Sequence, residues 1–228
     1  MISILLLSRG REAMLEDCID SIFNTSSTDL ELFIGCDTDD QTNYLRLHNK
    51  YSDRDVTFVY QKRGFFSVPD YFNTMSKLTS GNSIFVLNDD CKMGNSGWDL
   101  EIIDKLGDGS IPLYGRTYDD SIDRISNDYA AFPVITRSAY NRLGFFMDNT
   151  LENHGADVVT YRIYRDANKV VDLPNVKIEH LYHNSHEALK QREKDITANE
   201  MINRTFAKPF SVNLMLSTDI SDKVKLLS

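Results

Sequence analysis

The sequence predicts a single α/β domain whose mostly parallel sheet is flanked by helices. Short apolar runs rich in β-branched residues alternate with helix-patterned segments through residues 1–90. The residues that follow each run are polar, as expected at the carboxyl ends of parallel strands. At 41% hydrophobic and 26% charged, the 228 residues have the composition of a chain that folds around its own core.

The spacing of apolar residues predicts each element of the first half. Residues 2–7 form the first strand, and Leu15, Cys18 and Ile22 lie at the spacing of a helix with one buried face. Because strands that alternate with helices pair in parallel, the repeated pattern predicts βα units with helices on both faces of the sheet. The further elements expected are strands at 30–36, 56–60 and 83–87, with helices at 44–51 and 71–78.

The alternation changes after residue 90. The elements expected there are a helix at 98–106, a strand at 111–114, an Asp-rich loop at 118–129, a strand at 130–136, helices at 138–143 and 157–167, and a strand at 176–181. Many charges and little Gly or Pro predict one long surface helix over 185–204. We therefore expect one domain with two halves, 1–92 and 93–184, followed by a C-terminal helix and tail at 185–228.

Charge and cysteine content exclude several classes of protein. The 34 acidic against 25 basic residues give a net charge of −9, which disfavours a broad nucleic-acid-binding surface. The 3 cysteines form no CxxC pair, which disfavours a disulfide framework and a structural zinc site. No apolar run approaches the roughly 20 residues of a membrane span, and no secretory signal precedes the first strand. We expect a cytoplasmic protein without a membrane span.

The strand ends carry the residues that bind ligands in an open parallel sheet. Neither GxGxxG nor GxxxxGK[ST] is present, so a bound phosphate needs another clamp. Asp89 and Asp90 supply one, because carboxylates at the end of a buried strand can hold Mg²⁺ or Mn²⁺, although such pairs also form turns. The polar segments that follow the predicted strands are 8–11, 37–40, 62–64 and 88–90.

Two stretches resemble a known family. Residues 2–11, with the helix around Leu15 and then 32–37, are similar to the opening of GT-A-fold glycosyltransferases of the family-2 type. Residues 71–73 followed by 81–90 resemble the stretch that leads into the DxD metal motif of that family. The resemblance implies a metal-dependent, inverting enzyme that moves a sugar from a nucleotide sugar, with a UDP-sugar as the expected donor. It makes 1–92 the nucleotide-sugar-binding half and 93–184 the acceptor side.

The resemblance also implies roles for single residues. Asn88 stands where the first acidic residue of DxD usually lies, which leaves Asp90, helped by Asp89, to bind Mn²⁺ or Mg²⁺. A late histidine, His180 or else His183, is expected as a further metal ligand. Asp37 is expected to accept a hydrogen bond from a pyrimidine ring NH. The residues expected to contact the nucleotide sugar are Ser8, Arg9, Arg11, Asp37, Arg63, Asn73, Asn88 and Asp89.

Asp157 falls where such enzymes have their catalytic base, and Glu152 is the alternative. A carboxylate near the acceptor hydroxyl makes that oxygen nucleophilic as the sugar-phosphate bond breaks. The competing interpretation is that Asp157 caps a helix that begins near Val158.

The acceptor stays open between a glycan and another hydroxyl-bearing molecule, including a hydroxylated base in DNA of the phage type. Two other functions are also open. A sugar-phosphate nucleotidyltransferase shares the sheet and the metal, but it should carry a Gly-rich basic loop after the first strand, and residues 8–11 hold one glycine. A non-catalytic nucleotide-sugar-binding protein is the other, given Asn88.

Overall fold

The computed structural model describes residues 1–62, 68–120, 123–125, 129–149, 156–181 and 220–228. In chain order its elements are β1 (Ile2–Leu7), α1 (Glu12–Thr25), β2 (Leu30–Asp37), the 3-10 helix η1 (Thr38–Tyr44), α2 (Leu45–Lys50), β3 (Val56–Gln61), α3 (Val68–Ser76), β4 (Ser83–Asn88), β5 (Cys91–Met93), α4 (Trp98–Leu106), β6 (Tyr114–Asp119), β7 (Val134–Thr136), α5 (Arg137–Leu143), α6 (Ala156–Asp166) and β8 (Val170–His180). Residues 220–227 form a further helix.

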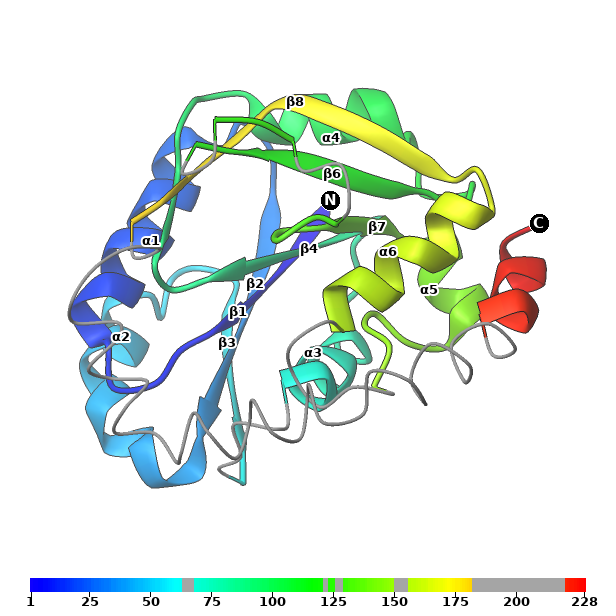
Figure 1. Cartoon of the computed structure of the whole chain (residues 1–228). Coiled ribbons are helices and arrows are strands. Elements are labelled where there is room, and N and C mark those ends of the chain that lie inside the picture. Colours follow the sequence, from blue (N-terminus) through cyan, green and yellow to red (C-terminus); the bar gives the residue numbers. More distant parts are fainter. Residues whose placement is uncertain (63–67, 121–122, 126–128, 150–155, 182–219) are drawn as a thin grey trace.

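The described strands make one mixed eight-stranded sheet in the order β3-β2-β1-β4-β7-β6-β8-β5. Helices cover both of its faces (Figure 1). Helices α1, α2 and α4 pack in one hydrophobic core, and α3, α5 and α6 pack in the other. The predicted α/β class is therefore confirmed. Among the described residues, no helix combines the length and the apolar character needed to cross a membrane.

Strand β1 lies at the centre of the parallel part of the sheet, between β2 and β4. Its side chains alternate between the two cores: Ile4 and Leu6 enter the core with α1, while Leu5 enters the core with α3. All three side chains are fully buried. A strand buried on both faces needs apolar residues at every position, which explains the continuous run that the sequence shows.

The register of the parallel strands brings their carboxyl ends to one level. Leu7 of β1 pairs with Gly35 of β2 and with Asn88 of β4. A Cβ on Gly35 would lie 2.6 Å from the Leu7 side chain and 3.1 Å from Tyr71, so a larger residue there would have to displace the Leu7 side chain. The segments that follow β1, β2 and β4 consequently emerge side by side.

The second half departs from the sequence prediction at several boundaries. The strand expected at 111–114 is β6, which begins at Tyr114 and extends through Asp119 into the start of the polar segment assigned to a loop. Its backbone bonds to β7 and β8 hold it in the sheet, so pairing outweighs its weak strand pattern. Strand β8 begins earlier, at Val170, and the short β5 was not predicted. The helix predicted at 185–204 lies outside the described residues.

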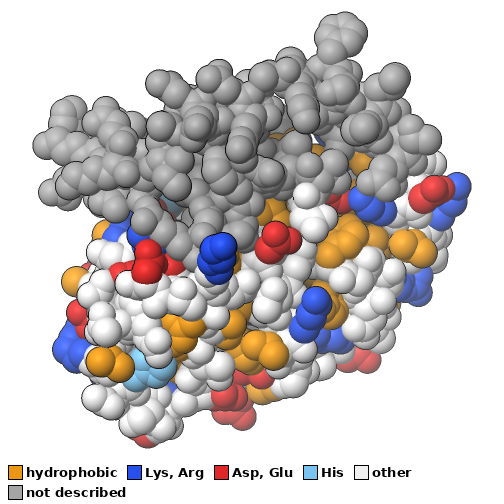
Figure 2. Space-filling view, turned by 90° about the horizontal axis from the view of Figure 1, so that it is seen from below, with side chains coloured by type: hydrophobic (Ala, Val, Ile, Leu, Met, Phe, Trp, Pro, Cys, Tyr) orange, Lys and Arg blue, Asp and Glu red, His pale blue; other side chains and the backbone are white. Residues whose placement is uncertain are grey.

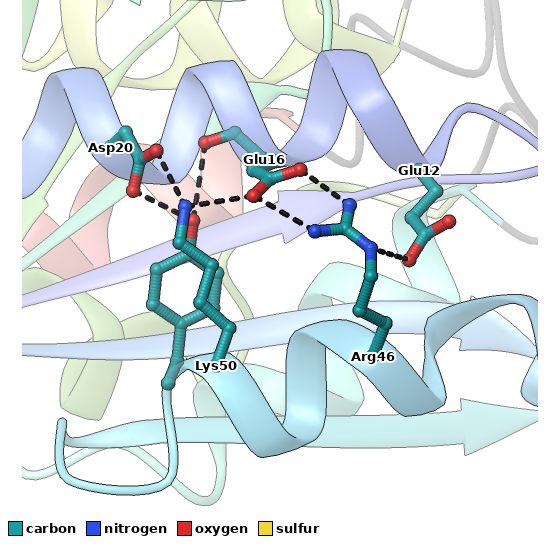
Figure 3. A network of polar contacts seen from close by, with 6 residues as sticks. Glu12, Glu16, Asp20, Arg46 and Lys50 are labelled. Carbon is teal, nitrogen blue, oxygen red and sulfur yellow. Dashed lines mark hydrogen bonds and ion pairs between the residues drawn. The ribbon is translucent and has the colours of Figure 1, made fainter.

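Helices α1 and α2 are joined by a surface network of ion pairs (Figure 3). Arg46 on α2 bonds to Glu12 at 3.0 Å and to both carboxylate oxygens of Glu16. Lys50 bonds to Glu16 at 2.8 Å and to Asp20 at 2.7 Å. Hydrogen bonds from Arg46 and Lys50 lower the pKa of Glu16 to about 2. The network holds α2 beside the helix that follows the first strand end.

We predict that Glu16→Gln lowers the Tm at pH 7 and low salt by at most about 3 °C, since exposed ion pairs contribute little. The pKa of Glu16 is lower in the folded state, so its contribution is present above pH 4.5 and is lost as the pH falls through about 2. Calorimetry across pH and salt measures the difference. A difference that stays constant in 1 M NaCl would contradict the electrostatic explanation.

Candidate functional site

The predicted strand-end residues meet at one edge of the sheet. Ser8, just beyond β1, donates a hydrogen bond to Asp89, just beyond β4, at 2.7 Å. Arg9 forms an ion pair with Asp37 at the end of β2. Arg11 forms ion pairs with Asp89 and, at 3.6 Å, with Asp90. The parallel register thus brings together six of the residues predicted from the sequence.

Asp89 points into the protein and joins the two central strand ends. Its side chain is buried and receives Ser8 Oγ at 2.7 Å and Arg11 Nε at 3.0 Å. Ser8 Oγ is also 2.9 Å from the hydroxyl of Tyr44. Burial raises the pKa of Asp89 to about 6 although the Arg11 cation and the Ser8 hydroxyl act in the opposite direction. The positive charge of Arg11 therefore offsets the negative charge of the buried Asp89 carboxylate.

Asp37 is held by two partners from different elements. Arg9 pairs with its Oδ2 atom, and the Tyr71 hydroxyl on α3 donates to its Oδ1 atom at 2.6 Å. Arg9 also lies 3.2 Å from Asp39. These contacts fix a carboxylate, which is an acceptor of hydrogen bonds when ionised, at the end of β2.

Asp90 and His180 come together although 90 residues separate them. Strand β5 pairs antiparallel with β8, and this register places Cys91 opposite His180. Asp90 Oδ1 lies 3.6 Å from His180 Nε2. Neighbouring ligand atoms of an octahedral Mg²⁺ ion lie roughly 3 Å apart. The distance between Asp90 Oδ1 and His180 Nε2 is therefore close to that of two atoms that bind one cation. The predicted pairing of Asp90 with a late histidine thus has a geometric basis.

Cys91 completes a group whose possible ligand atoms all lie within 4.8 Å of one another. Burial raises the pKa of the Cys91 thiol well above its ordinary value. Only the thiolate is a good metal ligand, and hard cations prefer oxygen. Asp90 and His180 are therefore the members of the group that suit Mn²⁺ or Mg²⁺.

The charges at this edge shift the pKa values of Asp90 and His180 in opposite directions. Burial alone would raise the pKa of Asp90, but His180 and Arg11 outweigh it and lower the pKa. Burial alone would lower the pKa of His180, but Asp119 and Asp90 raise it to about 9. In the metal-free protein at neutral pH, a protonated imidazole therefore lies beside these carboxylates.

Asp119 was not predicted from the sequence. It is buried at the end of β6, and its Oδ2 atom lies 3.8 Å from His180 Nδ1. The available signal was the Asp-rich segment that begins near it, but the sequence placed this segment in a loop. Only the pairing of β6 with β8 brings Asp119 to the histidine.

Asp157 lies in the first turn of α6 and is partly buried. The helix begins at Ala156, so Asp157 lies in its first turn, where a carboxylate also stabilises the helix N-terminus, and both interpretations of Asp157 stay predictions. Its charge is near enough to contribute to the raised pKa of the buried Tyr114. Glu152, Arg63 and His183 lie outside the described residues, so their predicted roles stay predictions.

Asn73 ties α3 to residues 146–147, which follow α5. Its Oδ1 atom accepts from the backbone N–H groups of Phe146 at 2.9 Å and Met147 at 3.0 Å, and its Nδ2 atom donates to the Met147 carbonyl at 2.8 Å. Asn88 ends β4 and is partly buried. The sugar-nucleotide contacts predicted for both residues stay predictions.

Comparison with known proteins identifies the fold. No protein-family model matches the sequence, and no curated protein matches it significantly. Mannosyltransferase PcManGT from Pyrobaculum calidifontis, solved with GDP-Man and Mn²⁺, shares 13% identity with a TM-score of 0.67 over 99% of this chain and 72% of its own. TarS 1-349 from S. aureus shares 11% identity with a TM-score of 0.62 over 97% of this chain and 77% of its own.

A structure of TarS 1-349 with UDP also matches, at 11% identity and a TM-score of 0.62, over 94% of this chain and 74% of that one. The likeness extends over nearly the whole chain in each case. The domain therefore has the GT-A fold of the glycosyltransferases, as its sequence predicted.

We predict that Arg11→Met lowers the free energy of unfolding by about 2 kcal/mol, because it leaves the buried Asp89 without its cation. Replacing Asp89 as well, in Arg11→Met/Asp89→Asn, should recover at least half of the loss, because the buried charge is then absent. Urea titrations of the wild type, Arg11→Met, Asp89→Asn and the double variant complete the double-mutant cycle. Equal stability of Arg11→Met and wild type would contradict the compensating role of Arg11.

Proposed function

We propose that this protein is a metal-dependent glycosyltransferase that moves a sugar from a nucleotide sugar to an acceptor hydroxyl with inversion. The observation that carries the proposal is the convergence of Asp90 and His180 at the strand-end edge of a GT-A sheet, 3.6 Å apart. Structural neighbours solved with GDP-Man and Mn²⁺ and with UDP add support from the fold.

Asp90 and His180 are the residues that would hold the divalent cation. Mg²⁺ is normally held by oxygen atoms alone, so the imidazole nitrogen favours Mn²⁺ of the two ions. When bound, the cation offsets the negative charge that develops on the leaving nucleoside diphosphate. Arg11, 3.6 Å from Asp90, adds a fixed positive charge at the same edge.

The contacts of Asp37 support a nucleotide base with a ring N–H group. A carboxylate accepts hydrogen bonds, and uracil and guanine both offer a ring N–H, whereas cytosine and adenine present a ring acceptor at the equivalent position. Arg9 and Tyr71 hold the carboxylate in place for this contact. We propose UDP as the donor nucleotide. GDP is tested beside it, because guanine also offers a ring N–H.

Asp157 is the general base of the proposal, and Glu152 is its alternative. An ionised carboxylate near the acceptor hydroxyl takes the proton as the oxygen attacks the anomeric carbon. The sugar then leaves the diphosphate with inversion, because attack occurs on the face opposite the leaving group.

A glycan is the acceptor that we propose. Acidic and basic side chains are interspersed over the described part of the surface that Figure 2 shows. With a net charge of −9, this pattern favours a neutral acceptor over DNA. A gel shift at low salt tests the choice, since a DNA-modifying enzyme should associate with DNA in a steeply salt-dependent way.

We predict that UDP or GDP with Mn²⁺ raises the Tm by about 5 to 10 °C at a hundredfold excess over the dissociation constant. CDP and ADP should give smaller shifts because their bases lack the ring N–H. EDTA should abolish the shift in the wild type, and Asp90→Ala should remove its dependence on Mn²⁺. Asp104→Asn, at an exposed position on α4, is the control and should leave every shift unchanged. No shift with any nucleotide would contradict the proposed donor site.

We predict that Asp157→Asn lowers the turnover number by about 10²- to 10⁴-fold while the affinity for the donor nucleotide stays unchanged, since the base acts on the acceptor. Release of nucleoside diphosphate from the donor, measured with a panel of glycan acceptors, gives the rate. Asp166→Asn, at the opposite end of α6, is the matched control. Wild-type turnover in Asp157→Asn would transfer the role to Glu152.

A further inference from the structure

Asp119 is a buried carboxylate that the proposed reaction does not yet use. It ends β6, and its side chain is 11% exposed. In the parallel pairing of β6 with β8, Asp119 lies opposite Ile178. His180 is two residues further along β8, and side chains two residues apart lie on the same face of a strand. Asp119 and His180 therefore share one face on adjacent strands.

The imidazole of His180 has one carboxylate at each nitrogen. Asp119 Oδ2 lies 3.8 Å from Nδ1, and Asp90 Oδ1 lies 3.6 Å from Nε2. Phe132 packs edge-on against the ring, at 5.1 Å between centroids and 84° between planes. The ring is thus confined in an orientation that aims Nε2 at the candidate metal ligand Asp90.

A histidine binds a metal through the lone pair of one nitrogen, so its single proton must lie on the other nitrogen. The partner of that second nitrogen decides which form is present. A carboxylate accepts a hydrogen bond but has no proton to donate when ionised, so it favours the form with the proton on the nitrogen that faces it. At His180, the nitrogen facing Asp119 is Nδ1.

We propose that Asp119 is a positioning residue that keeps the single proton of the neutral His180 imidazole on Nδ1. The lone pair of Nε2 is then free to bind the divalent cation together with Asp90. The inference rests on the proposed function, because it concerns the same metal site. The present separation of 3.8 Å between Asp119 Oδ2 and His180 Nδ1 exceeds hydrogen-bond range, so the proposal includes a small rotation of either side chain that would bring the two atoms into that range with the cation bound.

The backbone at Asp119 is held independently of its carboxylate, which makes a side-chain substitution informative. The N–H of Asp119 bonds to the carbonyl of Arg124 at 3.2 Å, and the N–H of Arg124 bonds to the carbonyl of Asp119 at 3.4 Å. The adjacent Asp120 is exposed and donates its own N–H to the carbonyl of Ile178 at 2.9 Å. Asp120→Asn therefore removes the same charge one residue away without removing the carboxylate that faces His180.

The test compares Mn²⁺ binding by the wild type, Asp119→Asn and Asp120→Asn, with electron paramagnetic resonance of free Mn²⁺ as a readout that needs no turnover. The expected dissociation constant of Asp119→Asn is about 10- to 100-fold higher, as is typical when the partner of a ligating histidine is lost. Asp120→Asn should differ from wild type by less than about twofold. Equal affinities in Asp119→Asn and Asp120→Asn would overturn the inference.

The protonation form of His180 in the wild-type chain is the second measurement, and it does not depend on whether a variant folds. Two-bond ¹⁵N–¹H spectra of the protein with Zn²⁺, a diamagnetic ion that imidazole readily binds, should show the proton on Nδ1, and a proton on Nε2 would overturn the role of Asp119. If the wild type binds neither Mn²⁺ nor nucleotide, the proposed function fails and the inference fails with it. If the wild type binds both and Asp119→Asn binds Mn²⁺ equally well, the inference alone fails.

Discussion

The parallel pairing of β1 with β4 is the constraint on which the candidate site depends. Both strands are buried between two hydrophobic cores, and a shift of one residue would exchange the sets of side chains that enter them. The register that satisfies both cores pairs Leu7 with Asn88. The next residues along each strand, Ser8 and Asp89, then meet at 2.7 Å. Burial of apolar surface, which contributes more free energy than single hydrogen bonds, therefore decides where the polar site forms.

Asp89 and Asp90 have identical side chains but different roles, because they face different parts of the structure. Asp89 faces the interior, where Ser8 and Arg11 satisfy its carboxylate and join the two central strand ends. Asp90 faces β8, where His180 and Arg11 favour its ionised form. The first stabilises the edge of the sheet and the second is available as a cation ligand. The guanidinium of Arg11 couples the two, so the structural contact and the candidate metal site share one cation.

The second half of the chain supplies the groups that face this edge. Strands β6 and β8 carry Asp119 and His180, and the antiparallel β5 closes the sheet beside them. On the other side, Asn73 holds the backbone at residues 146–147, and Lys223 of the C-terminal helix bonds to the buried Asp148 at 2.6 Å. These contacts fix residues 146–148. The site is therefore assembled from segments far apart in the sequence.

The sequence by itself determined the α/β class, the four parallel strands and the residues that follow them. Local periodicity is sufficient for these features because a strand buried on both faces must be apolar throughout, and the polar residues beyond it must lie at the sheet edge. The resemblance to GT-A glycosyltransferases also predicted Asp90, with His180 or else His183, as metal ligands, and these roles stay predictions. Only the tertiary structure decided the extent of β6 and β8, the existence of β5, the partners of Asp37 and Asp89, and the presence of Asp119. Those features depend on backbone pairing and on contacts between distant residues, which the local spacing of apolar side chains does not encode.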